Sequence, residues 1–347
     1  MLELTTKCNL NCTYCFRKFL SSREITEIDL DIARAIIKKA SKSGVKRIVL
    51  SGWGEPLTHP DILEVISAIK SSGMEVLLNT NGVLLEEYVR DIHRLRVDSL
   101  VVSIDSASDE IYSKLRLGGD LYKIVHALQE LRELRIRGPY TPDLHIHFTV
   151  TKLNYACLTD VIKLAKDVGA SHVVVSNVIP LSSDIEESLA CYRDPSCTSS
   201  IEEVSYEAAR LSLLYGISVL LPKFTTSVSE RSCPFITKRA AFVRVDGLVT
   251  PCIYYSRRWS VTMNNITREL YPVVFGDLRT DELSEIWLST SYVKFRVITY
   301  FMHEPSCLDC PLEHYCTLTL TNRYDCWGNS PTCAHCPYSR DIVRCPL

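Results

Sequence analysis

Short apolar runs alternate with stretches of helical periodicity through the first half of the chain. Each run is rich in β-branched residues or leucine and is bounded by turn residues, as buried strands are. The runs lie at 2–6, 47–51, 75–79, 99–104, 145–150 and 172–176. Between them, apolar residues recur every three or four positions, which predicts helices at 30–40, 62–69, 85–95, 122–137 and 159–168.

This alternation predicts an α/β fold. Six strand-helix units in succession indicate a parallel sheet with right-handed crossovers. Because a closed barrel needs eight such units, we expect a partial (β/α)6 TIM-like barrel over residues 1–180. In such a barrel the chemistry lies at the carboxyl ends of the strands, where the connecting loops converge.

The pattern changes beyond the barrel. Residues 181–232 are interpreted as a connector with one helix near 201–215. From 233 to 347 the alternation stops, and the end of the chain is rich in cysteine, proline and polar residues. Such a segment buries little apolar surface, so we expect a small cysteine-rich domain that needs metal to fold.

Charge excludes several classes of partner. The chain has 39 Lys and Arg against 41 Asp and Glu, a formal net charge of -2. It therefore lacks the overall positive electrostatic potential that would attract nucleic acid or an anionic membrane. No uncharged apolar run reaches the roughly 18 residues that span a bilayer. The N-terminus has the pattern of a strand followed by cysteines rather than a signal peptide. We therefore expect a cytoplasmic protein with no nucleic-acid or membrane partner.

Cysteine is the unusual component, with 15 residues. The odd count, the absence of an export signal and the close Cys-x-x-Cys spacings favour metal ligation over a disulfide scaffold, because a reducing cytosol keeps thiols free. Cys157, Cys191 and Cys197 lie outside every motif. We expect these three to be buried apolar groups or connector thiols rather than ligands.

Three cysteines follow the first expected strand, Cys8, Cys12 and Cys15, in a Cys-x3-Cys-x2-Cys pattern. Three thiolates can hold three irons of a 4Fe-4S cluster and leave the fourth iron open for chemistry. The alternative is a zinc site completed by a distant fourth ligand. The position of this loop at the expected active-site end of the barrel favours the cluster.

This triad, with Tyr14 before its last cysteine, resembles the radical S-adenosylmethionine (SAM) superfamily. The resemblance implies that SAM binds the open iron and is reductively cleaved to a 5'-deoxyadenosyl radical, which abstracts a hydrogen atom from a substrate. The electron would come from a low-potential donor such as ferredoxin. The protein would orient the cofactor and exclude water.

Further motifs at successive strand ends resemble family elements near SAM. The Gly-Trp-Gly-Glu-Pro stretch after the second strand is similar to the family's Gly-Gly-Glu-Pro stretch, which receives the methionine amino group. Lys152 is a candidate partner of the SAM carboxylate and Asn177 of the adenine, although a solvated lysine and ordinary turn chemistry are alternatives. The implied SAM-contacting residues are Tyr14, Gly54, Glu55, Pro56, Asn79, Ser103, Asp105, Lys152 and Asn177.

The C-terminal cysteines are similar to the SPASM extension of radical SAM maturases, which holds two auxiliary 4Fe-4S clusters. Two such clusters need eight thiolates, and nine cysteines are candidates: Cys233, Cys252, Cys307, Cys310, Cys316, Cys326, Cys333, Cys336 and Cys345. The spacing departs from the family pattern in two places: the cysteine usually found four residues after Cys316 is missing, and no second cysteine lies near Cys233. The sequence therefore leaves open which cysteines would bind which cluster. A zinc module of Cys310, Cys316, Cys333 and Cys336 is an alternative.

The run from Cys326 to Cys345, taken with the Gly-Trp-Gly-Glu-Pro loop, resembles maturases encoded beside tungsten-dependent aldehyde oxidoreductases. This implies a radical SAM maturase that modifies a protein or cofactor, with a protein or peptide substrate and a tungsten-dependent oxidoreductase as the candidate partner. One alternative is a peptide-modifying enzyme of the sulfatase-maturase or ribosomal-peptide type. Others are a non-catalytic iron-sulfur electron-transfer protein and a zinc-stabilised interaction module.

Overall fold

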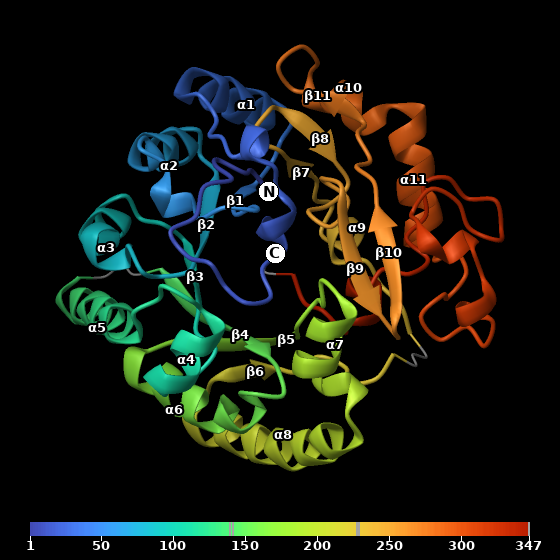
Figure 1. The fold of residues 1–347 in the computed structure, drawn as a ribbon. Coiled ribbons are helices and arrows are strands. Elements are labelled where there is room, and N and C mark those ends of the chain that lie inside the picture. Colours follow the sequence, from blue (N-terminus) through green and yellow to red (C-terminus); the bar gives the residue numbers. More distant parts are fainter. Residues whose placement is uncertain (139, 141, 227–229, 346–347) are drawn as a thin grey trace.

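A parallel sheet forms the centre of the protein in the computed structural model, which describes residues 1–138, 140, 142–226 and 230–345. Its strand order follows the sequence, from β1 to β6. The strands are β1 (Arg47–Leu50), β2 (Glu75–Thr80), β3 (Ser99–Ser103), β4 (Asp143–Val150), β5 (His172–Asn177) and β6 (Ser218–Leu220). The sheet curves into an open barrel with helices outside it (Figure 1), which confirms the expected fold class.

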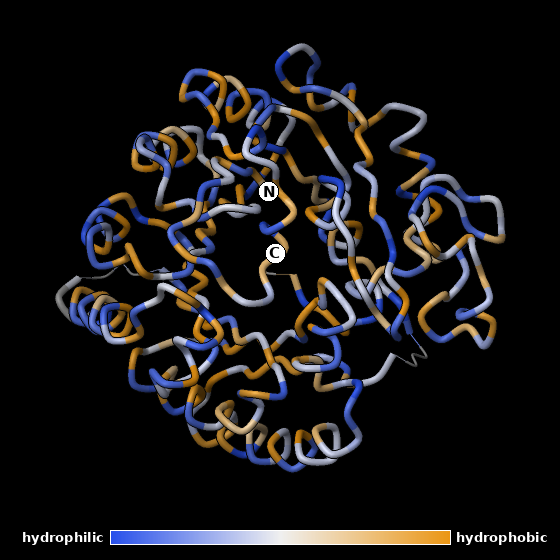
Figure 2. Tube along the Cα trace, in the orientation of Figure 1, coloured by the Kyte–Doolittle hydropathy of each residue, from blue (hydrophilic) through white to orange (hydrophobic). Residues whose placement is uncertain are grey.

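Helices cover the outer face of this sheet. They are α1 (Leu30–Lys42), α2 (Ile62–Ser71), α3 (Leu85–Arg94), α5 (Leu121–Arg137), α6 (Leu158–Val168) and α8 (Pro195–Tyr215). The short helices α4 (Asp109–Leu115) and α7 (Ser183–Leu189) lie inside this ring, and α7 contacts β9 (Trp259–Met263) of the C-terminal part (Figure 1). Helix α1 illustrates why these segments are helical. The Asp29 carboxylate caps its first turn by accepting hydrogen bonds from the amides of Asp31 and Ile32. The apolar stripe that includes Ile36 and Ile37 is buried. Apolar and polar residues alternate around these helices (Figure 2).

Two strand positions differ from the expectation. The segment 2–6 forms isolated bridges rather than a regular strand. Leu2 pairs with Leu50 on one side and with Val243 on the other. The sheet instead gains β6, which lies in the segment expected to be a connector and pairs with β5. Its three residues are too few to produce a recognisable alternation in the sequence.

The C-terminal part packs against the open side of the barrel (Figure 1). It contains a sheet of order β11-β8-β7 and a hairpin of β9 and β10. Its strands are β7 (Phe242–Val243), β8 (Leu248–Thr250), β9 (Trp259–Met263), β10 (Ile266–Leu270) and β11 (Gly276–Asp277), and its helices are α9 (Pro234–Thr237), α10 (Leu283–Leu288) and α11 (Thr290–Tyr300). No helix in the described part of the chain is long and apolar enough to cross a membrane.

The end of the chain returns into the barrel, and we call residues 338–345 the tail. The Ile342 carbonyl accepts from the Asn177 backbone amide at 3.3 Å, and the Arg344 amide donates to Ser176 Oγ at 3.0 Å. Both bonds attach the tail to the carboxyl end of β5. The tail therefore lies close to the barrel centre (Figure 1).

A buried ion pair joins the N-terminal segment to the C-terminal part. The Glu3 carboxylate, with no exposed surface, accepts from Arg257 Nη1 at 3.0 Å and Nη2 at 2.5 Å. It also accepts from the backbone amides of Trp53 and Val245, at 2.9 and 3.1 Å. Both oxygens of this carboxylate thus accept hydrogen bonds, from donors in three separate segments.

We predict that Arg257→Met lowers the free energy of unfolding by about 3–5 kcal/mol, because it leaves the Glu3 carboxylate buried without its cation. Urea unfolding of the reconstituted protein measures the change. Arg210→Met is the control, because its partner Glu207 forms an ion pair with it on the surface and such pairs contribute little. Equal effects of the two substitutions would contradict the importance of the buried pair.

Candidate functional site

A cavity of about 1160 Å³, open to solvent, lies at the carboxyl ends of the barrel strands. It collects most of the residues that the sequence motifs indicate. Those that line it are Cys8, Cys12, Tyr14, Cys15, Gly54, Glu55, Asn79, Ser103 and Asn177. Pro56, Asp105 and Lys152 do not line it. We call this space the carboxyl-end cavity.

The loop with the cysteine triad rests on the segment after α4. The amides of Asn11 and Thr13 donate to the carbonyls of Leu117 and Leu115, each at 3.0 Å. Burial raises the pKa of all three thiols, that of Cys15 to about 11. Burial thus disfavours the free thiolates despite the nearby Arg17 and Arg116 cations, and a metal group that binds the three sulfur atoms would compensate their charge.

The Gly54-Glu55 stretch is fixed against the segment that carries the triad. A Cβ on Gly54 would lie 2.3 Å from the Lys7 carbonyl oxygen, so no other residue fits this close approach. The buried Glu55 carboxylate accepts from Thr80 Oγ1 and from the Asn81 amide, both at 2.7 Å. Burial raises the pKa of Glu55 despite these bonds. Glu55 thus ties together the loops after β1 and β2.

Asp105 lies below the cavity and organises its floor. Its Oδ2 accepts from the Tyr14 hydroxyl and from Arg116 Nε, the latter at 2.7 Å, and its Oδ1 accepts from the Thr149 amide at 2.8 Å. Asp105 is fully buried. It therefore acts here by positioning Tyr14 and Arg116, which do line the cavity.

Arg116 is a functional candidate that the motifs missed. Burial disfavours its charged form, but the Asp105 carboxylate outweighs burial and holds the pKa of Arg116 well above its usual value. A cation is therefore fixed in the wall of the cavity. The residue follows α4, a seven-residue helix that the apolar pattern did not predict.

Lys152 and Asn177 have different surroundings. Lys152 Nζ lies 3.0 Å from Asp194 Oδ2, in an ion pair outside the cavity lining. Asn177 Nδ2 donates to the carbonyls of Lys223 and Ile342, both at 2.9 Å. Its Oδ1 is buried with no partner in the described residues, so an acceptor remains available beside the cavity.

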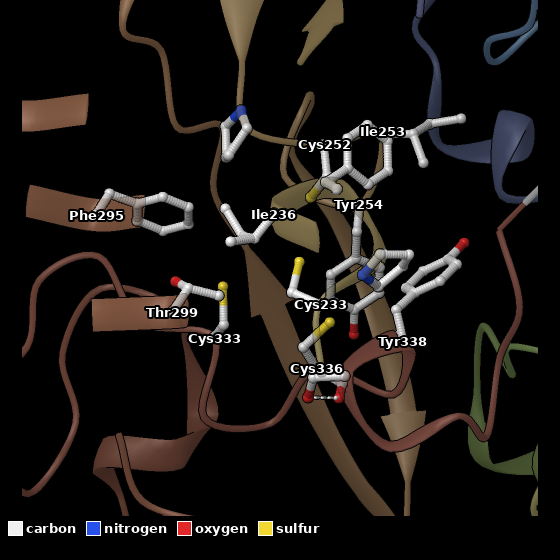
Figure 3. Close-up of a pocket in the computed structure, with 14 residues that line it drawn as sticks. Cys233, Ile236, Cys252, Ile253, Tyr254, Phe295, Thr299, Cys333, Cys336 and Tyr338 are labelled. Atoms are coloured by element: carbon white, nitrogen blue, oxygen red, sulfur yellow. Dashed lines mark hydrogen bonds between the residues drawn. The ribbon is translucent and has the colours of Figure 1, made fainter. Parts of the chain in front are cut away.

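Four C-terminal thiols face a second cavity of about 460 Å³. The side chains of Cys233 and Cys252, and of Cys333 and Cys336 from a single turn, point into it (Figure 3). Burial raises the pKa of each thiol, that of Cys336 to about 12. Four buried thiols around an apolar space suit a fully ligated 4Fe-4S cluster.

A second group of cysteines surrounds a cavity of about 220 Å³ lined by Cys307, Cys316 and Cys326. Cys310 lies one turn from Cys307, since its amide donates to the Cys307 carbonyl at 3.3 Å. Cys333 and Cys336, which the alternative zinc grouping combines with Cys310 and Cys316, line a cavity with Cys233 and Cys252, whereas Cys316 lines the other one.

Cys345 lines neither of these two C-terminal cavities. It lines the carboxyl-end cavity together with the triad. Burial raises the pKa of its thiol to about 12. The structure thus places Cys345 with the N-terminal triad rather than with the thiols of the second cavity.

Two of the remaining cysteines differ from the expectation of free thiols. Cys191 and Cys197 form a disulfide at the start of α8, with their Cα atoms 5.3 Å apart. Their spacing of six residues contains no metal-binding pattern, and the pairing arises from the turn that places them side by side. Cys157 is free.

Comparisons with known proteins agree with this geometry. The Radical SAM superfamily model matches residues 2–165, and the iron-sulfur cluster-binding domain model, SPASM, matches residues 233–311. The chain is 31% identical over 351 residues to the tungsten-containing aldehyde ferredoxin oxidoreductase cofactor-modifying protein of Pyrococcus furiosus. That match covers 100% of this chain and 96% of the relative.

Solved structures share the fold. Streptococcus suis SuiB bound to S-adenosylmethionine superposes with a TM-score of 0.64 at 15% identity, covering 91% of this chain and 71% of SuiB. The protein anSMEcpe with bound AdoMet gives a TM-score of 0.64 at 16% identity, covering 98% and 94% of the two chains. The family interpretation of the motifs is confirmed. Together these findings show that the chain belongs to the radical SAM superfamily, whose enzymes use SAM with a 4Fe-4S cluster, and that it carries a SPASM iron-sulfur domain.

Proposed function

We propose that this enzyme matures a tungsten-dependent aldehyde oxidoreductase, by modifying either the polypeptide of that enzyme or its metal cofactor. The observation that carries the proposal is the full-length similarity to the Pyrococcus furiosus cofactor-modifying protein. It is supported by three thiols in one solvent-open cavity with a fixed cation. The partners proposed are this oxidoreductase and a low-potential electron donor such as ferredoxin.

The residues of the carboxyl-end cavity have distinct proposed roles. Cys8, Cys12 and Cys15 would hold a 4Fe-4S cluster, which supplies the electron and the open iron position for SAM. The backbone at Gly54 would receive the SAM amino group, since glycine keeps that surface free of a side chain. Asn177 Oδ1, which lacks a partner in the described residues, would accept from the adenine amino group.

Arg116 replaces Lys152 as the proposed partner of the SAM carboxylate. Its Nε donates to Asp105, which leaves the rest of its planar fork for a carboxylate in the cavity. Lys152 is paired with Asp194 elsewhere. Asp105 fixes the orientation of the fork, which lowers the entropy cost of binding SAM.

The two groups of four cysteines would hold the auxiliary clusters. Cys233, Cys252, Cys333 and Cys336 form the first proposed set, and Cys307, Cys310, Cys316 and Cys326 the second. The cavity of the first set adjoins the carboxyl-end cavity, because Ile253 and Tyr338 line both of them. That contact suits electron transfer or positioning of a large substrate.

We expect Arg116→Gln to weaken SAM binding at least tenfold, because the carboxylate of SAM loses a charge-assisted partner. Lys152→Gln is the matched control and should leave SAM affinity unchanged. Equilibrium binding of SAM to the anaerobically reconstituted variants makes the measurement, with the iron content checked for each. A larger loss in the Lys152 variant would restore the assignment made from the sequence.

Alanine at Cys8, Cys12 and Cys15 together should abolish formation of 5'-deoxyadenosine while about eight irons remain, four in each auxiliary cluster. Alanine at Cys333 and Cys336 should remove about four irons, because two ligands of one set are lost. Cys345→Ala is the control for that pair and should retain the full iron content. Iron and sulfide analysis with product detection tests all three.

Several outcomes would reject these assignments. If the triple variant still forms 5'-deoxyadenosine, the triad does not hold the SAM-binding cluster. An iron count near zero in that variant would reject two independent auxiliary clusters, as would zinc in their place. Loss of four irons from Cys345→Ala would move that residue into a ligand set.

Deleting the gene should leave the tungsten-dependent oxidoreductase present but inactive, because its maturation is missing. Unrelated molybdopterin enzymes should keep their activity. Complementation with the wild-type gene should restore the tungsten enzyme, whereas the triple cysteine variant should not. A fully active tungsten enzyme in the deletion strain would remove this role and leave peptide modification of the sulfatase-maturase or ribosomal-peptide type as the alternative.

A further inference from the structure

A large cavity lies at the amino ends of the barrel strands, opposite the end that carries the cysteine triad. Its volume, counted with the solvent-open space at its mouth, is about 1980 Å³. Its lining includes Asp143, His145 and His172, none of which belongs to a radical SAM or SPASM motif. We call it the amino-end cavity.

The sheet brings these three side chains together. Asp143 and His145 are two residues apart in β4 and therefore point to the same face. His145 pairs in register with His172 of the neighbouring strand β5, and the two rings are 4.4 Å apart between centroids. One ligand atom from each of the three residues lies within 4.8 Å of the other two.

Ser171 orients two members of this group from outside it. Its hydroxyl lies 2.7 Å from His172 Nδ1 and donates to Asp143 Oδ1. With a proton on Nδ1 of His172, the Nε2 lone pair is free for a metal. Outer hydrogen bonds that fix the tautomer of a histidine and the direction of a carboxylate are a regular feature of metal sites.

The spacing also suits coordination. His145 Nε2 and Asp143 Oδ2 are 2.8 Å apart. Two ligands bound at about 2.0–2.2 Å lie roughly 2.9 Å apart at a right angle and roughly 3.4 Å apart at a tetrahedral angle. A small adjustment therefore lets one ion replace the proton between these two atoms. Two imidazoles and one carboxylate suit Zn²⁺ and its neighbours rather than Ca²⁺ or Mg²⁺, which prefer oxygen ligands.

We propose that Asp143, His145 and His172 form a binding site for one divalent first-row transition-metal ion, separate from the iron-sulfur sites. Three protein ligands leave at least one coordination position open toward the amino-end cavity, where water or a small ligand completes the shell. The ion joins β4 to β5 at the end of the barrel remote from the triad. This inference does not depend on the proposed function.

The test is zinc binding to the reconstituted holoprotein, with all iron-sulfur clusters in place. Under anaerobic conditions, equilibrium dialysis against Zn²⁺ followed by metal analysis should find one zinc per chain and an unchanged iron count. His172→Ala and Asp143→Asn should each weaken zinc binding at least tenfold. His126→Ala is the matched control, because His126 forms an exposed pair with Glu86 at 3.0 Å and the described residues place no third metal-binding group beside the pair.

Three results would overturn the site: no zinc bound by the holoprotein, zinc bound only as iron is lost, or equal affinity in the wild type and His172→Ala. If His172→Ala also loses iron or thermal stability, His172→Gln decides, since its amide retains a hydrogen bond to Ser171 but is a poor zinc ligand. Loss of zinc affinity in a stable Gln variant supports the site, and retained affinity rejects it.

Discussion

The arrangement of the segments around the carboxyl-end cavity depends on one group, the carboxylate of Glu3. It is a single buried charge that receives donors from the loop after β1, from the strand region near Val245 and from Arg257. Because an unmatched buried charge is costly, these three segments take one relative position. The cysteine triad follows Glu3 in the chain by five residues, so the same constraint locates the loop that bears it.

Aromatic packing also holds the barrel against the C-terminal part near Glu3. Trp53 contacts Phe16 just after the triad and Trp259 in β9, with ring centroids 4.6 and 5.8 Å apart. Its indole N–H donates to Ser256 Oγ at 2.9 Å. The bulky residue within the Gly-Trp-Gly stretch thus has a physical role: it fills the space between the barrel and the SPASM part. Gly52 beside it is small because Glu3 occupies the adjoining volume.

Local sequence signals predicted the parts of the site that depend on nearby residues. The spacing of Cys8, Cys12 and Cys15 and the alternation of strands and helices are visible in short windows of the sequence, and the structure contains both. The division of the C-terminal cysteines was not predictable, because Cys233 joins Cys336 only through the path of a hundred intervening residues. Arg116 was missed for a different reason: it follows the short helix α4, which the apolar pattern did not predict, and its importance comes from its ion pair with Asp105, eleven residues earlier.

The tail separates the two cavities of the barrel, because Val343, Arg344 and Cys345 line both of them. Its first residue, Tyr338, follows Cys336 by two positions, and Cys333 and Cys336 both line the second cavity. The consequence is a mechanical link between the cysteine-rich domain and both ends of the barrel. A rearrangement of the segment that carries these two thiols also moves the residues that lie between the carboxyl-end and amino-end cavities.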